Sequence, residues 1–243
     1  MRIIAISSQK GGSGKTTLSG HLAVQASMSG AGPVALIDTD PQGSLSHWWN
    51  ERQNDKPSFV QTSISKLSDD LEELKTHGFK TVIIDTPPAI TTAIQAVVSL
   101  SDLVVIPTRP SPHDLSAAGA TVDIVERAGK PLLFVINSAT PRAKLTTEAA
   151  IALSQHGMVA PSIIHNRQDF AVSMIDGRTV MEMPKHSKSS DEIEALWSYV
   201  EERLHKVMPK KLFRHTAPRV SFGRRKTPVF EENISQVNQV GGI

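Results

Sequence analysis

The stretch Lys10-Gly-Gly-Ser-Gly-Lys15-Thr16-Thr17 decides the fold of this 243-residue chain. It follows the apolar run Arg2–Ser7, which is typical of a buried strand, and it opens a run from Lys15 to about Ser29 with helical spacing. Glycines let backbone N–H groups curl around phosphate oxygens, and the start of a helix points unpaired amides at the same phosphates. A glycine-rich turn in this context predicts a phosphate-binding loop.

The residues of this loop have distinct predicted parts in binding ATP and Mg²⁺. Lys15 is expected to reach the β- and γ-phosphates, and the Thr16 hydroxyl is expected to ligate Mg²⁺. The ATP site is expected to be lined by Gly11, Gly12, Ser13, Gly14, Lys15, Thr16 and Thr17.

Apolar runs alternate with helical patterns along the rest of the chain. Strands are predicted at 33–38, 81–85, 103–107, 132–137 and 158–164, and helices at 67–77, 91–99, 115–128, 146–156 and 190–207. Strands that are apolar throughout and alternate with helices imply a mostly parallel sheet covered on both faces. The expected fold is therefore α/β and doubly wound, with ligands bound outside the carboxyl ends of the strands.

Composition separates a predicted ATPase domain, residues 1–206, from a C-terminal extension, residues 207–243. The extension holds seven Lys/Arg against two Glu, which leaves a net charge of −3 on residues 1–206 because the whole chain carries +2. A solubilising tail and a tail that binds a polyanion are both compatible with this charge.

Features that the sequence lacks indicate where in the cell the protein is expected to act. It has no cysteine, which excludes disulfides, thiolate metal sites and iron–sulfur clusters. The first apolar run is too short for a signal peptide, and no stretch approaches the 18 apolar residues of a membrane span. We therefore expect a cytoplasmic protein.

Two more predicted strands end in acidic turns, Asp38-Thr-Asp40-Pro-Gln42 and Asp85-Thr-Pro-Pro88. Carboxylates at the same sheet edge as the phosphate loop can hold Mg²⁺ directly or through water. Each turn alone is also compatible with an Asx-turn or a helix cap. Three motifs in order, each at a strand end, favour a nucleotide site.

The arrangement K-G-G-x-G-K-T, with an extra lysine at Lys10, resembles the deviant Walker A loop of the ParA/MinD family of P-loop ATPases. Asp38–Gln42 resembles the family's D-x-D-P-Q motif, and Thr108–Ala118 (TRPSPHDLSAA) resembles a segment of short ParA proteins of the ParF type. The resemblance covers roughly residues 1–205.

This resemblance implies roles for residues beyond the loop. Lys10 is expected to cross an ATP-dependent homodimer and touch the ATP of the partner. Asp38 and Asp85 are expected near Mg²⁺, Asp40 is expected to position the attacking water, and Asn137 is expected to contact the adenine amino group. The alternatives are a solvated loop lysine for Lys10 and a strand-end turn for Asn137. Asp114 is expected to cap the helix that begins near Leu115, and Trp48 and Trp49 are expected to serve packing or a dimer surface.

Within the family, the resemblance favours a ParA-type positioning ATPase that hydrolyses ATP slowly without a partner. An ATP dimer is expected to bind nonspecific double-stranded DNA at the nucleoid, and a ParB-like or cargo-bound adaptor is expected to stimulate hydrolysis and release. The cargo is a plasmid, a chromosome or a protein assembly. Candidate contacts to DNA phosphates are Arg167, Arg178, Lys185, Lys188, Arg224 and Arg225.

Other members of the superfamily fit the sequence less well. Nitrogenase iron proteins and arsenite-pump ATPases need cysteines, and tyrosine autokinases carry a tyrosine cluster, whereas Tyr199 is the only tyrosine here. The tail scatters its apolar residues and contains prolines, which disfavours a membrane helix of the MinD type. The main alternative is a MinD-like or regulatory assembly ATPase at a membrane or a protein machine; a metabolic P-loop enzyme leaves Lys10 unexplained.

Overall fold

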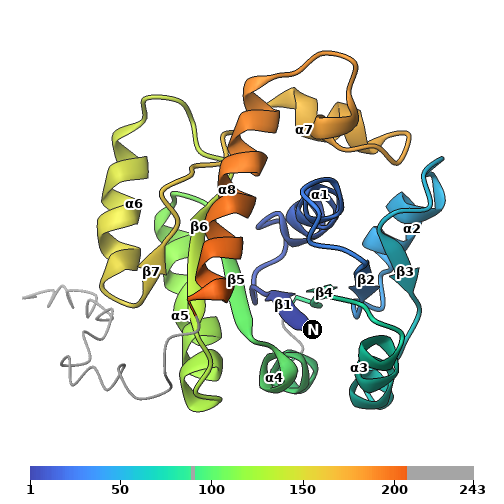
Figure 1. Ribbon diagram of the computed structural model, residues 1–243. Helices are drawn as coiled ribbons and strands as arrows, with labels where there is room; N and C mark the ends of the chain where they lie inside the picture. The colour runs from blue at the N-terminus through green and yellow to red at the C-terminus, as the bar shows by residue number, and fades with distance from the viewer. Residues whose placement is uncertain (89–90, 207–243) are drawn as a thin grey trace, which may run out of the picture. The chain divides into compact units, whose positions relative to one another are not determined.

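The computed structural model describes residues 1–88 and 91–206, and its centre is a seven-stranded parallel sheet (Figure 1). The sheet order is β3-β2-β4-β1-β5-β6-β7, so the direction of winding changes around β1. The strands are β1 (Arg2–Ile6), β2 (Val34–Asp38), β3 (Ser58–Val60), β4 (Thr81–Asp85), β5 (Leu103–Thr108), β6 (Leu132–Ile136) and β7 (Met158–Val159). The predicted doubly wound α/β fold is confirmed.

Helices cover both faces of this sheet (Figure 1). They are α1 (Lys15–Met28), α2 (Ser44–Asn50), α3 (Leu67–Thr76), α4 (Thr91–Leu100), α5 (Pro112–Arg127), α6 (Lys144–Ser154), α7 (Gln168–Met174) and α8 (Lys188–His205), with a 3-10 turn η1 (Val180–Glu182). One core cluster joins the sheet to α1, α2, α7 and α8, and the other joins it to α3, α4, α5 and α6. Neighbouring residues of β1 serve opposite clusters, Ile4 and Ile6 one and Ala5 the other. Burial on both faces explains why the strands are apolar throughout.

Some predicted elements differ from the structure. The strand predicted at 158–164 has only two residues, and the short elements β3 and α7 were missed. Three to seven residues give too few repeats for a periodic pattern to identify an element. The predicted extension 207–243, with Arg224 and Arg225, lies outside the described residues. Within residues 1–88 and 91–206, no helix is both long and apolar enough to cross a membrane.

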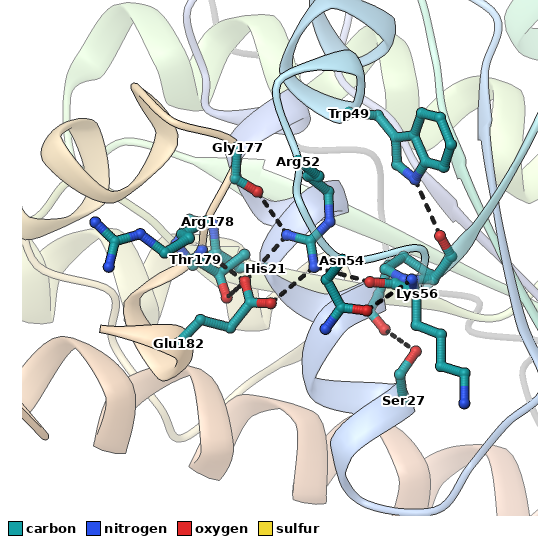
Figure 2. A network of polar contacts seen from close by, with 12 residues as sticks. His21, Ser27, Trp49, Arg52, Asn54, Lys56, Gly177, Arg178, Thr179 and Glu182 are labelled. Carbon is teal, nitrogen blue, oxygen red and sulfur yellow. Dashed lines mark hydrogen bonds and ion pairs between the residues drawn. The ribbon is translucent and has the colours of Figure 1, made fainter. Parts of the chain in front are cut away.

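A buried arginine joins α2 to the segment that precedes α8 (Figure 2). The Arg52 side chain is 1% exposed, and its nitrogens lie 2.7 and 3.0 Å from the two carboxylate oxygens of Glu182. It also donates to the carbonyl of Gly177 at 2.6 Å, and its guanidinium lies 4.9 Å from the ring centroid of Trp48. A buried charge must be paired and hydrogen-bonded, so this network fixes the two segments together.

Both tryptophans of α2 are packing residues. Trp48 is buried, and its Nε1 donates to the Arg178 carbonyl at 3.1 Å. Trp49 packs on Phe59 with ring centroids 5.4 Å apart, and its Nε1 donates to the Pro57 carbonyl. Their indole rings therefore hold α2 against the body of the domain.

Helix α1 is tied to the same segment through His21. Its Nδ1 donates to the Thr17 carbonyl at 2.8 Å, and its Nε2 accepts the Val180 N–H at 3.3 Å. Burial lowers the pKa of His21 to about 4, so the ring is neutral near pH 7 and can accept at Nε2. The segment from Gly177 to Glu182 is thus bonded to both helices that follow the predicted nucleotide motifs.

We predict that Gly177→Ala lowers the free energy of unfolding by at least about 3 kcal/mol. Gly177 has φ +74°, and an added Cβ would lie 2.4 Å from the Arg52 backbone nitrogen, so left-handed strain and a backbone clash combine. Gly30→Ala is the matched control, because Gly30 has φ +84° and an added Cβ there would meet no described atom within 4 Å. This substitution should cost only about 1 kcal/mol. Urea unfolding of both variants measures the difference; equal losses would contradict the proposed close approach.

Candidate nucleotide-binding site

The phosphate loop leaves β1 at the carboxyl edge of the sheet and ends at Gly14, the N-cap of α1. Gly14 has φ +93°, and an added Cβ would lie 2.1 Å from Nδ2 of Asn137. Asn137 Nδ2 donates to the Ser13 carbonyl at 2.7 Å, and the Asn137 side chain is buried. The loop is therefore held by the residue that follows β6, and only glycine fits at position 14.

Lys15 is folded over the loop. Its side chain is 7% exposed, and Nζ donates to the Lys10 carbonyl at 3.3 Å. Burial lowers the pKa of Lys15, while the carboxylates of Asp85 and Asp40 oppose that shift. A confined ammonium beside exposed loop glycines suits the binding of a polyphosphate.

Thr16 and Asp85 form a hydroxyl–carboxylate pair of the kind that holds Mg²⁺. Thr16 Oγ1 donates to Asp85 Oδ2 at 2.7 Å, while the buried Asp85 Oδ1 has no hydrogen-bond partner within the described part of the chain. Burial raises the pKa of Asp85 to about 7, with a further contribution from Asp38. An oxygen donor beside an unpaired buried carboxylate oxygen fits Mg²⁺, which prefers oxygen ligands and keeps several waters.

Asp38 is engaged with the backbone. Its Oδ1 accepts the N–H of Asp40 at 2.9 Å, and its Oδ2 accepts the N–H groups of Leu45 and Ser46 at 3.1 and 3.0 Å. Burial raises the pKa of Asp38, and these hydrogen bonds oppose the shift. Asp38 thus orders the start of α2, as the helix-cap interpretation expects, and a role near Mg²⁺ stays a prediction. Its Cα is paired with that of Asp85 across β2 and β4.

Asp40 lies in the same turn, where its Oδ1 accepts the Gln42 N–H at 3.0 Å. No cluster of three or more His, Cys, Asp or Glu side chains suited to a metal occurs among residues 1–88 and 91–206. Thr16 and Asp85 are the predicted ligands whose geometry suits Mg²⁺, and Asp38 stays a predicted ligand beside them.

Lys10 forms an ion pair that the sequence did not predict. Its Nζ lies 2.6 Å from Asp114 Oδ2, and Ser111 Oγ donates to the same oxygen. Burial disfavours ionisation, yet the hydrogen bonds from Lys10 and Ser111 hold the pKa of Asp114 below its usual value. Lys10 is therefore not a freely solvated lysine.

The predicted capping role of Asp114 is wrong. Helix α5 begins at Pro112, and Ser111 is its N-cap, accepting the Asp114 N–H at 3.2 Å. Proline is favoured in the first helical turn because its missing N–H is not needed there. The motif Ser111-Pro112 was the available signal, and it frees the Asp114 carboxylate for Lys10.

The candidate cations for DNA differ in how they are paired. Arg167 Nη2 lies 2.7 Å from Glu192, which also accepts from His165, and Arg178 Nη2 lies 2.6 Å from Asp176. Lys185 and Lys188 are exposed, and neither forms an ion pair within the described residues. These two lysines keep their charge available.

A phosphate loop at the carboxyl edge of a parallel sheet, with a Thr–Asp pair beneath it, defines a P-loop nucleotide-binding protein. Residues 4–180 match the family model described as the CobQ/CobB/MinD/ParA nucleotide binding domain. The chain belongs to this family, and the resemblance drawn from its motifs is confirmed.

Two relatives carry the name "Maintenance of carboxysome distribution protein A". The chain is 31% identical to the one from Halothiobacillus neapolitanus over 211 residues, covering 81% of this chain and 95% of that protein. It is 33% identical to the one from Gloeobacter kilaueensis over 209 residues, covering 84% and 94%. The likeness thus extends over nearly the whole of both relatives.

Solved structures share the fold. The MinC:MinD cell division complex of Aquifex aeolicus matches with a TM-score of 0.71 at 19% identity, covering 83% of this chain and 96% of that chain. The ATP complex of a Cyanothece McdA variant matches with a TM-score of 0.62 at 19% identity, covering 84% and 96%.

We predict that Asp85→Asn stabilises the nucleotide-free protein at pH 8 and abolishes the rise in Tm caused by Mg²⁺ and ATP together. Because the pKa of Asp85 is raised in the folded protein, its protonated carboxyl contributes to the stability of the wild type. This contribution is fully present below the pKa of the unfolded state and is lost as the pH rises through about 7. The difference between the two pKa values corresponds to an upper limit of about 4 kcal/mol at pH 8, vanishing near pH 4. Thermal unfolding between pH 4 and 8 tests both parts; a gain that is independent of pH would contradict the first.

Proposed function

We propose that this chain is a ParA-type positioning ATPase that dimerises with ATP, binds nonspecific DNA as a dimer and is released by partner-stimulated hydrolysis. The observation that carries the proposal is the second lysine, Lys10, beside a P-loop in a chain that aligns with carboxysome distribution proteins over nearly their full length. Lys15 is the lysine proposed to bind the nucleotide of its own chain, so Lys10 is left for a contact with a second copy.

The cargo we propose is a protein assembly. Both relatives described above are named for the distribution of carboxysomes, whereas a relative named ParA from Rhizobium radiobacter matches only 51% of this chain at 30% identity. An adaptor protein bound to the assembly would stimulate hydrolysis.

In the proposed reaction a water molecule attacks the γ-phosphorus of ATP, the bond to the β,γ-bridging oxygen breaks, and ADP and phosphate leave. Lys15 binds the β- and γ-phosphates, and Asp40 orients the water. Thr16 and Asp85 would hold Mg²⁺, which when bound offsets the charge of the phosphates.

The Lys10–Asp114 ion pair adds a free-energy cost to the proposed dimerisation. To reach the nucleotide of a second copy, Lys10 must exchange a buried carboxylate for phosphate oxygens. An isolated monomer keeps Lys10 on Asp114, which is consistent with slow hydrolysis without a partner. Phosphate oxygens in a dimer offer a stronger counter-charge than one carboxylate.

A second candidate is a MinD-like ATPase that acts at a membrane, favoured by the fold similarity to MinD with a TM-score of 0.71. The exposed Lys185 and Lys188, the candidate contacts to DNA, suit anionic lipid equally well. The choice of polyanion separates the two functions.

We predict that nonspecific double-stranded DNA is bound with ATP, is not bound with ADP, and is not bound with ATP by Lys10→Ala. Binding should weaken steeply between 50 and 200 mM salt, values at which phosphate contacts of this kind lose orders of magnitude in affinity. Fluorescence anisotropy of a labelled duplex measures DNA binding under all three conditions. Flotation with anionic vesicles measures membrane binding under the same conditions. ATP-dependent vesicle binding without DNA binding would support the membrane function instead.

We predict that the double variant Lys185→Ala/Lys188→Ala lowers DNA affinity uniformly across sequences and reduces the slope of log affinity against log salt by about 2. The control is Lys66→Ala/Lys80→Ala, two exposed lysines that directly precede α3 and β4, which should leave DNA affinity unchanged. Arg167→Ala is a poorer probe, because it removes a partner of Glu192. Equal losses in both double variants would mean that total charge, and not this surface, governs binding.

A further inference from the structure

Arg109 is a cation beside the phosphate loop, and the proposed steps of ATP binding and hydrolysis do not use it. It directly follows β5, so the chain brings it out at the same sheet edge as the loop. Its side chain reaches the loop itself, since a Cβ built on Gly12 would lie 3.7 Å from Arg109 Nη2. Arg109 is exposed and forms no ion pair within residues 1–88 and 91–206.

The charges around Arg109 leave it uncompensated. Asp114 is close enough to interact with the charge of Arg109, but its Oδ2 already accepts from Lys10 and Ser111. Lys10 and Arg109 together against Asp114 give a net charge of one positive at this point. A guanidinium presents several donors in a planar fork that matches phosphate oxygens.

The surface beside Arg109 is open to another molecule. Gly11 and Gly12 are exposed, and a Cβ built on Gly11 would meet no atom of the described residues within 4 Å. Ser13 and Lys15, by contrast, are buried in the other half of the loop, where Lys15 interacts with the charges of Asp85 and Asp40. The nucleotide of this chain is proposed to bind in that buried half, whereas Arg109 stands on the exposed half, next to Lys10.

We propose that Arg109 contacts the nucleotide phosphates held by a second copy of this chain, as a second cation delivered in trans beside Lys10. The inference rests on the proposed ATP-dependent dimer and adds a residue outside the phosphate-loop motif. Asp114 holds Lys10 in the monomer, so Arg109 is the cation that is free to meet the incoming phosphates first. Positive charge at this position stabilises both the dimer and the charge that spreads over the phosphoryl group during transfer.

The first test compares full-length wild type with Arg109→Ala. Affinity for ATP is measured by titration of a fluorescent ATP analogue at protein concentrations too low for dimerisation, and self-association with ATP is measured by sedimentation. The expected result is an ATP affinity within about twofold of wild type and an ATP-dependent dimer weakened at least about tenfold. Arg109→Lys, which keeps the charge but not the fork, should fall between the two.

The matched control is Arg127→Ala, at the other end of α5. The helix runs from Pro112 to Arg127, so this arginine is about 22 Å along it from Pro112. Arg127→Ala should dimerise as wild type does. If Arg109→Ala also dimerises and hydrolyses ATP as wild type does, the inference is overturned, while the proposed function stands. If wild type itself does not dimerise with ATP, the proposed function and this inference both fail.

A mixing experiment separates action in trans from action in cis. Arg109→Ala binds ATP but lacks the cation, and Lys15→Ala supplies the cation but holds no ATP, so a mixed dimer has one complete site. Mixing should restore hydrolysis above the sum of the two variants alone. A mixture of Lys10→Ala with Lys15→Ala is the positive control. Restoration in that control but not with Arg109→Ala would assign Arg109 to its own chain's nucleotide and overturn the inference.

Discussion

The contact between Asn137 and the phosphate loop is the constraint on which the site depends. The Asn137 amide donates to the Ser13 carbonyl at 2.7 Å, and it lies so close to Gly14 that an added Cβ would be 2.1 Å away. This approach is possible only because β1 and β6 end at the same edge of one parallel sheet. It fixes the turn from which α1 starts, and with it the directions of Lys15 and Thr16.

Charged side chains are buried around this turn. Asp85 is 1% exposed, and one of its carboxylate oxygens has no hydrogen-bond partner among residues 1–88 and 91–206. Burial raises its pKa to about 7. Such a group is costly in the free protein, and a bound cation would remove the cost. Perturbed groups of this kind gather at functional sites because their burial suits the ligand and not the empty fold.

The elements that follow the nucleotide motifs converge on one segment. His21 on α1 accepts the Val180 N–H, and Arg52 beyond α2 holds Gly177 and Glu182 (Figure 2). The same segment leads to the exposed Lys185 and Lys188. These hydrogen bonds therefore connect the helices that follow the nucleotide motifs to the segment that leads to the surface proposed for DNA.

The sequence by itself determined the fold class, the position of the phosphate loop and the strand ends at Asp38 and Asp85. Those features depend on local sequence patterns, namely apolar runs, a glycine-rich turn and a hydroxyl residue directly after a lysine. Only the tertiary structure decided that Lys10 pairs with Asp114, that Asn137 holds the loop, that Asp38 orders α2 and that Arg109 reaches Gly12. Each of these contacts joins residues on different strands or loops, and the partner of a charged or amide side chain follows from which strand ends meet, which no local pattern specifies.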